Sequence, residues 1–399
     1  MKQIIYLLDG LTPYALSKFN KVYSGITNKN NFVNKLMKNS HIYVNAFGYG
    51  ETYSTTYGFN TGQDIYKTNC DSFQNFNSFP QNKNLALYFQ KNNYKNIFFR
   101  NAHHNSPTKG FYGRYLNTIT KNFDYICLKK KKKNYTFNNF CEDQNLDDLL
   151  IKNHNLMFYF HDFTLHDHKL VYKNSSPEKY LTAFEEASKI IEKNLKRLKF
   201  NANNDILYFL SDHGMTYAPY DQMYFNRNFN YESNYHNLYL KDKIQFVFFV
   251  KFPNSKKKKI VKFVEPKKIF SLIKIYNEKY NYSNLLKSIK KKLSNSIIIS
   301  LKSPISDKFN NFFIKETLHT HLLYLSFKKK ISFALNHPNK YFDLIYLRII
   351  NRKECPKVFL NKIKNYYSKK NMYKKIFIYF MSLINRIFQK LLTKYKNVI

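Results

Sequence analysis

Cysteine is scarce in this chain of 399 residues, and the scarcity excludes two kinds of protein. The four cysteines are Cys70, Cys127, Cys141 and Cys355. They are too few for a disulfide scaffold at this length, and their spacing is not that of a cysteine-ligated metal site. Met1-Lys2 runs straight into an apolar stretch, so we expect no secretory signal peptide. Both absences favour a reducing compartment, and we expect a cytoplasmic protein.

Acidic residues are also few, since 26 Asp and Glu stand against 66 Lys and Arg, a formal net charge of +40. Such a charge attracts polyanions. However, Lys, Asn, Ile, Tyr and Phe are all abundant, which indicates a general bias in residue usage. The lysine runs 129–133 and 256–259 are typical of solvated loops, and no helix-turn-helix, zinc-finger or RNA-binding signature accompanies them. We therefore expect no specific nucleic-acid partner.

The basic C-terminal tail, residues 356–399, lacks an apolar run long enough to span a membrane. Its run 376–384 has nine residues, whereas a spanning helix needs ~20. Two interpretations remain open for this segment. It lies flat on an anionic membrane, peripheral to the inner face, or it packs as a helix on the rest of the protein.

Four apolar runs in the sequence carry an aspartate or a histidine at one end. The polar residues concerned are Asp9 after run 3–8, His161, Asp162, His166 and His168 after run 155–160, Asp212 and His213 after run 206–210, and His236 before run 245–250. Short continuous apolar runs are typical of strands covered on both faces, and ligands often lie just beyond the carboxyl ends of such strands. One strand-end aspartate is an ordinary turn residue. Several in one chain indicate metal ligands at one edge of a sheet.

Helical patterns alternate with these runs. After the start signal Ser176-Pro177, apolar residues recur at helical spacing to about Lys199. Alternating elements of this kind predict an α/β fold, with a mostly parallel central sheet and helices on both faces. At this length a large α/β domain with a smaller C-terminal one is natural.

These strand-end residues make the chain resemble the alkaline phosphatase superfamily, and most closely its sulfatase-like branch of sulfatases, phosphodiesterases and phosphotransferases. The resemblance implies two divalent metal ions above the sheet, Zn or Mn first and Ca or Mg as alternatives. It implies one metal position from Asp9, Asp212, His213 and the nucleophile, and a second from Asp162, His166 and His236. It assigns His168 to no metal.

The resemblance also points to a nucleophile. In sulfatases the nucleophile stands ten residues before the glycine of a Thr-Gly pair, and counting back from Thr61-Gly62 reaches Thr52. Residue 52 is no cysteine, and residues 54–56 do not have the proline, serine and arginine of the sulfatase pattern. We therefore expect no formylglycine, and a threonine nucleophile resembles the phosphoester enzymes of the superfamily. Ser54 and Thr55 remain rival nucleophiles.

Further residues match loops that contact the substrate in sulfatase-like enzymes. Arg100 and His103 are candidates to contact the transferring group, with His104 behind them. Arg114 is a candidate to pair with phosphate. An arginine beside two histidines is also common at a solvated rim, and that interpretation stays open.

The resemblance implies a catalytic α/β domain over residues 1–300 and a small antiparallel sheet over 301–355. The basic tail over 356–399 follows as a third part. Residues 316–325 and 340–347 alternate like paired strands. We expect a metal-dependent phosphoester hydrolase or phosphotransferase, hydrolase first, in surface glycan or lipid metabolism. Two alternatives stay open: a sulfatase acting on sulfate esters, and a non-catalytic binding protein of the same fold.

Overall fold

The computed structural model describes part of the chain. The described residues are 1–16, 31–49, 52–63, 84–101, 119–128, 146–152, 155–166, 168, 177–214, 245–278, 282–301, the strand segments 321–326, 331–337, 340–343 and 348–350, and positions 357 and 361.

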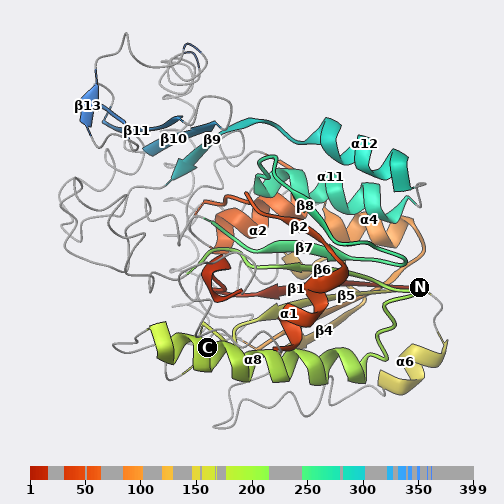
Figure 1. The fold of residues 1–399 in the computed structure, drawn as a ribbon. Coiled ribbons are helices and arrows are strands. Elements are labelled where there is room, and N and C mark those ends of the chain that lie inside the picture. The colour runs from red at the N-terminus through yellow and green to blue at the C-terminus, as the bar shows by residue number, and fades with distance from the viewer. Residues whose placement is uncertain are drawn as a thin grey trace, which may run out of the picture.

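An eight-stranded sheet with the order β4-β3-β5-β1-β6-β7-β2-β8 forms the centre of the described structure (Figure 1). Its strands are β1 (Lys2–Leu8), β2 (His41–Tyr43), β3 (Lys95–Arg100), β4 (Tyr125–Leu128), β5 (Leu156–Asp162), β6 (Ile206–Leu210), β7 (Phe248–Lys251) and β8 (Lys258–Ile260). The five strands from β4 to β6 are parallel, and β7 runs antiparallel to both β6 and β2. The predicted α/β fold with a mostly parallel sheet is confirmed.

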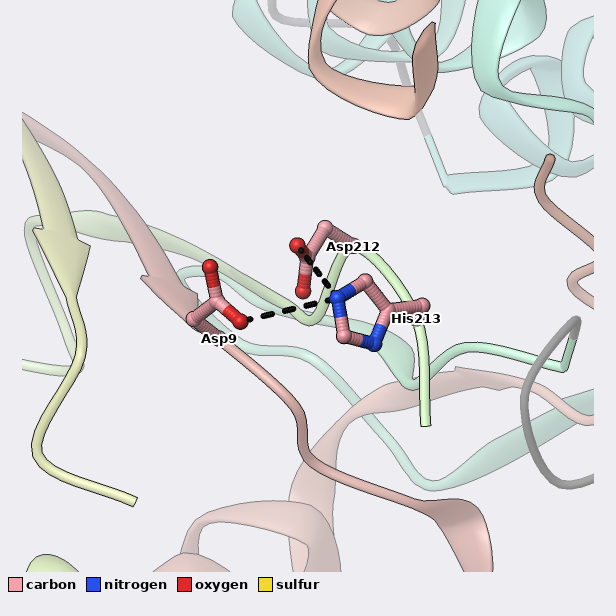
Figure 2. Close-up of side chains that lie close together, drawn as sticks. All are labelled: Asp9, Asp212 and His213. Atoms are coloured by element: carbon pink, nitrogen blue, oxygen red, sulfur yellow. Dashed lines mark ion pairs between the residues drawn. The ribbon is translucent and has the colours of Figure 1, made fainter. Parts of the chain in front are cut away.

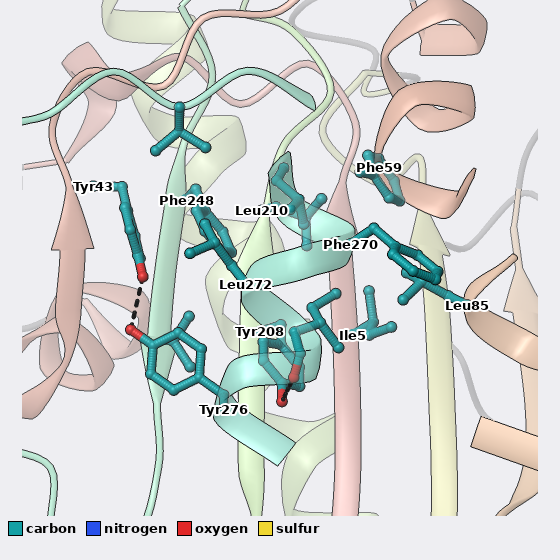
Figure 3. Packing of buried hydrophobic residues seen from close by; sticks show 14 of the residues in the cluster. Ile5, Tyr43, Phe59, Leu85, Tyr208, Leu210, Phe248, Phe270, Leu272 and Tyr276 are labelled. Atoms are coloured by element: carbon teal, nitrogen blue, oxygen red, sulfur yellow. Dashed lines mark hydrogen bonds between the residues drawn. The ribbon is translucent and has the colours of Figure 1, made fainter. Parts of the chain in front are cut away.

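Helices cover both faces of this sheet (Figure 1). They are α1 (Phe32–Leu36), α2 (Thr52–Thr61), α4 (Leu85–Lys91), α6 (Leu146–Lys152), α8 (Pro177–Arg197), α11 (Pro266–Asn277) and α12 (Tyr282–Lys292). One buried cluster joins the sheet to α2, α4, α11 and α12, and Figure 3 shows its packing around Phe270 and Leu272. A second cluster joins the opposite face to α1, α6 and α8. We call these the α2 face and the α8 face.

Side chains of the buried strands alternate strictly between the two faces. In β1, Ile5 and Leu7 belong to the α2 face, and Ile4, Tyr6 and Leu8 belong to the α8 face. All five are fully buried, which explains why the strand reads as a continuous apolar run. The same alternation continues beyond the strand ends and decides which polar residues meet.

A second sheet has five antiparallel strands in the order β13-β12-β11-β10-β9. Its strands are β9 (Ser296–Leu301), β10 (His321–Ser326), β11 (Ile331–His337), β12 (Lys340–Asp343) and β13 (Arg348–Ile350). The two strands expected from alternation overlap β10 and β12, and the sheet begins a few residues before the predicted boundary at 301. The interpretations of the basic tail concern residues outside the described part, apart from positions 357 and 361.

Two further features bear on the expectations from composition. No helix in the described part of the chain is long and apolar enough to cross a membrane. Cys127, on β4, is disulfide-bonded, and its partner lies outside the described residues. The low cysteine count did not predict this bond.

Candidate metal and nucleophile site

The carboxyl ends of β1 and β6 bring two aspartates together on the α2 face. The strands are adjacent and parallel, with Leu7 beside Leu210 in register. Asp9 follows Leu7 by two residues and Asp212 follows Leu210 by two, so both carboxylates point to the α2 face. Both side chains are fully buried. The run-end pattern in the sequence thus places two carboxylates at one point.

One group of acidic and histidine side chains that could hold a metal ion is found among the described residues (Figure 2). It consists of Asp9, Asp212 and His213, each of which offers one ligand atom within 4.8 Å of the others. His213 Nε2 lies 3.7 Å from Asp9 Oδ1 and 3.4 Å from Asp212 Oδ2. The backbone N–H of Gly10 donates to the other Asp212 oxygen, Oδ1, at 3.2 Å. Gly10 adopts a positive φ of 74°, which lets the chain turn directly after Asp9.

Thr52, the first residue of α2, completes this group. Its Oγ1 lies 3.3 Å from Asp9 Oδ2 and 3.3 Å from His213 Nε2. The structure therefore brings together the four residues that the resemblance assigns to one metal position. Thr55, a rival nucleophile, is buried and its hydroxyl accepts a hydrogen bond from the Tyr49 N–H at 3.3 Å. The side chain of Ser54, the other rival, lies outside the described part.

The donor set fits a divalent cation. Ligands bound at ~2.0–2.2 Å in a tetrahedron lie about 3.4 Å from one another, close to the separations found here. His213 Nδ1 is 2.9 Å from the Gly214 carbonyl, so Nδ1 carries the hydrogen and Nε2 presents its lone pair to the centre. Asp212 Oδ2 is buried without a hydrogen-bond partner among the described residues. A buried carboxylate oxygen in that position requires a cation or a proton donor.

Asp162 does not join this group. It follows His161 on β5, so its side chain points to the α8 face. Its Oδ2 accepts a hydrogen bond from the Tyr6 hydroxyl at 2.6 Å. Its Oδ1 accepts from Asn101 Nδ2 at 2.9 Å and from the Thr164 N–H and hydroxyl at 2.9 and 2.5 Å. Burial and the neighbouring Asp162 charge raise the pKa of Tyr6 well above its usual value, so Tyr6 remains a donor.

His161, the residue before Asp162, lies on the α2 face instead. It pairs in register with Leu7 on one side and with Arg100 on the other. Its Nε2 lies 3.5 Å from Asp9 Oδ2, and neither ring nitrogen has a hydrogen-bond partner among the described residues. Burial, and then the charges of Arg100, His166 and His213, lower its pKa well below 6.5. His161 is therefore a neutral imidazole beside Asp9, a role that the sequence did not reveal.

Arg100 and His166 lie close to this centre. Arg100 is buried, and its Cζ lies 5.0 Å from the centre of the Phe163 ring. The same ring is 4.5 Å from the His161 ring. The His166 ring is 6.3 Å from the His213 ring. Four predicted site residues lie outside the described residues: His103, His104, Arg114 and His236.

The comparisons with known proteins concern the fold. No family model matches the sequence, and no curated protein does. A solved protein of the alkaline phosphatase superfamily from Vibrio parahaemolyticus matches with a TM-score of 0.53 at 11% identity, over 96% of this chain and 87% of its own. The fold is that of the alkaline phosphatase superfamily.

Two enzymes share this alkaline phosphatase superfamily fold. The lipoteichoic acid synthase LtaP from Listeria monocytogenes has a TM-score of 0.54 at 11% identity, over 94% of this chain and 91% of its own. A 2-O GAG sulfatase has a TM-score of 0.51 at 13% identity, over 99% of this chain and 93% of its own. The expected fold is confirmed, and the chemistry of the site rests on the geometry described above.

Proposed function

We propose that this protein is a metal-dependent hydrolase or transferase that acts on phosphoesters, with Thr52 as its covalent nucleophile. The observation that carries the proposal is the Thr52 hydroxyl at the start of α2, 3.3 Å from both Asp9 Oδ2 and His213 Nε2. Asp9, Thr52, Asp212 and His213 would hold the ion, and their carboxylate, hydroxyl and imidazole donors suit Zn or Mn. A bound divalent cation supplies activation of the hydroxyl and neutralises developing charge on the phosphoryl oxygens.

The side chains account for each half of the reaction. Thr52 Oγ1 forms a bond to phosphorus as the bond from phosphorus to the substrate alcohol breaks. The hydroxyl proton passes to Asp9 Oδ2, and the alcohol leaves with a proton from water. The N–H groups in the first turn of α2, which have no acceptor within the helix, would stabilise the phosphoryl oxygens. Water, or an acceptor hydroxyl in a transferase, then attacks phosphorus as the bond from phosphorus to Thr52 Oγ1 breaks. Thr52 takes its proton back from Asp9, and the proton of the attacking group neutralises the hydroxide left by the first half.

Phosphoesters are preferred to sulfate esters because residue 52 is a threonine, which cannot become formylglycine. A lipoteichoic acid synthase and a GAG sulfatase share the fold, so we place the substrate among phosphoesters of surface glycans or lipids. Hydrolysis is the first reaction to test. Arg100 and His161, side by side on the α2 face, are proposed to contact the transferring group together with His103. Arg114 and His104 remain proposed substrate contacts.

Turnover of p-nitrophenyl phosphate, bis-p-nitrophenyl phosphate and p-nitrophenyl sulfate tests the proposal. The purified chain is loaded with Zn or Mn and compared with Thr52→Ala and with Thr182→Ala, which alters an exposed threonine of α8. We expect phosphoester turnover in the wild type and Thr182→Ala and none in Thr52→Ala. Sulfate-ester turnover alone would make the protein a sulfatase. No turnover together with no bound ion would favour the non-catalytic alternative.

A further inference from the structure

Asp162 does not fit the second metal position assigned to it, because its carboxylate lies on the α8 face and already accepts four hydrogen bonds. Asp162 Oδ1 accepts three hydrogen bonds, one from Asn101 and two from Thr164, and Oδ2 accepts one from Tyr6. The side chain is fully buried on the α8 face. A cation on the α2 face would have to draw this carboxylate through the sheet and break all four bonds.

The four hydrogen bonds indicate a structural role for Asp162. Tyr6 lies on β1, Asn101 directly follows β3, and the Tyr6 hydroxyl in turn accepts from Asn194 of α8 at 3.0 Å. Asn101 Oδ1 accepts from the Phe163 N–H at 2.6 Å. One carboxylate therefore connects the ends of three neighbouring strands to the helix that covers them. The strand ends so connected carry Asp9, Arg100 and His161.

The α2 face offers no replacement for the missing carboxylate among the described residues. On β5 the residue that points to this face is His161, whose imidazole ring supplies no negative charge in place of the carboxylate. Beside it in register stands Arg100, a permanent cation on the same face. A divalent ion placed near His161 would be repelled by the buried guanidinium, because like charges interact strongly in a low-dielectric interior.

We infer that the centre binds one divalent cation, held by Asp9, Thr52, Asp212 and His213, and that Asp162 is a structural anchor of the strand ends. The inference rests on the proposed function and narrows it, since one ion would have to serve the attacking oxygen without a partner ion for the leaving group.

Counting bound ions separates this inference from the proposed function. Metal-free protein is loaded with Zn or with Mn, freed of excess ion and weighed by native mass spectrometry, and affinity is measured by titration calorimetry. The variants are Asp212→Asn, Asp162→Asn and, as a matched buried aspartate distant from the site, Asp205→Asn, whose carboxylate accepts from the Lys2 and Asn201 N–H groups.

We expect one ion in the wild type, none in Asp212→Asn and one in Asp162→Asn. Loss of a group that is hydrogen-bonded to a metal ligand lowers metal affinity by about tenfold or more. The affinity of Asp162→Asn for the ion should change by much less than that. Its melting temperature should fall like that of Asp205→Asn, because Tyr6 loses its acceptor. Should Asp162→Asn not fold, Thr164→Ala, which keeps the carboxylate and removes one donor, should still bind one ion.

Two ions in the wild type, with one lost in Asp162→Asn, would overturn the inference and leave the proposed function standing. No bound ion in the wild type would overturn both.

Discussion

The two faces of the central sheet use buried polar groups in opposite ways. On the α2 face, Asp9, Asp212 and His213 converge with ligand atoms within 4.8 Å of one another, and Asp212 Oδ2 has no hydrogen-bond partner among the described residues. On the α8 face, the Tyr6 hydroxyl donates to Asp162 Oδ2 at 2.6 Å, and both groups make further hydrogen bonds. Unsatisfied buried oxygens mark a place for a ligand, whereas satisfied ones hold a fold together.

Adjacent residues of β5 show how little separates the two uses. His161 and Asp162 are consecutive and both fully buried, yet one lies beside Asp9 and the other beside Tyr6. Successive strand residues point to opposite faces, so a single position decides between chemistry and structure. Variants that exchange or remove these groups test the difference directly.

Asp212→Asn has the largest expected effect. It removes a charged ligand from the α2 face, so turnover should fall by about 10³-fold or more, as when one member of a catalytic unit is lost. Asp162→Asn, the corresponding change on the α8 face, should retain turnover. Steady-state kinetics of folded protein at saturating Zn or Mn measures both. Equal losses in the two variants would remove the distinction between the faces.

Removal of the metal should also affect stability. An ion that binds only the folded chain stabilises it by about 2.7 kcal/mol when its free concentration is 100 times Kd. Chelation should therefore lower the melting temperature of the wild type, and added Zn or Mn should restore it. Asp212→Asn should not respond to either treatment. A wild type that melts at the same temperature with and without chelator would contradict the assigned site.

His41 tests whether a buried polar group on the α2 face, away from the metal site, affects stability alone. It is buried on β2, with Nδ1 2.7 Å from the Tyr276 hydroxyl, and burial and then Lys258 lower its pKa to about 4. The unfolded chain, with a histidine pKa of about 6.5, takes up the proton first. Stability should therefore decline by up to about 3 kcal/mol as pH falls from about 6.5 to about 4.

Urea unfolding across that pH window measures the decline, with His41→Phe as the comparison. The variant should show a shallower fall in stability, because its unfolded state has one proton fewer to bind. An identical slope in both proteins would mean that His41 does not carry the effect. Metal content should be the same in both, since His41 is not among the residues of the site.

Tyr6→Phe is expected to have the smallest effect and to act on stability alone. It removes one donor from the charged Asp162 and leaves Asn194 Nδ2 without its acceptor, which costs about 2 kcal/mol. Chemical denaturation should show this loss, while ion stoichiometry stays at the wild-type value. A lost ion with unchanged stability would place Asp162 in the metal site after all.

Much of the fold follows from local sequence. The apolar runs of β1, β5 and β6 are continuous because both faces of these strands are covered, and α8 shows a helical repeat from Pro177 to Arg197, close to the predicted limits. Asp9, Asp212 and His213 were predictable because each lies within three residues of the end of such a run. The spacing to Thr61-Gly62 located Thr52.

The choice between His161 and Asp162 was not predictable from the same signals. It depends on the register of β5 against β1 and β3, and shifting a strand by one residue exchanges every side chain between faces. No local pattern in an all-apolar strand specifies that register. The resemblance therefore assigned a metal to Asp162, while the residue that lies on the α2 face is its neighbour His161.

Thr52 as nucleophile is tested most directly by trapping the covalent intermediate. The metal-loaded protein is mixed with p-nitrophenyl phosphate, quenched in acid during turnover and digested, and the peptides are identified by mass spectrometry. We predict that the peptide containing Thr52 gains the mass of one phosphoryl group at that residue, and that Thr52→Ala gains none. A phosphoryl group on Ser54 or Thr55, or turnover with no phosphorylated peptide, would contradict the role assigned to Thr52.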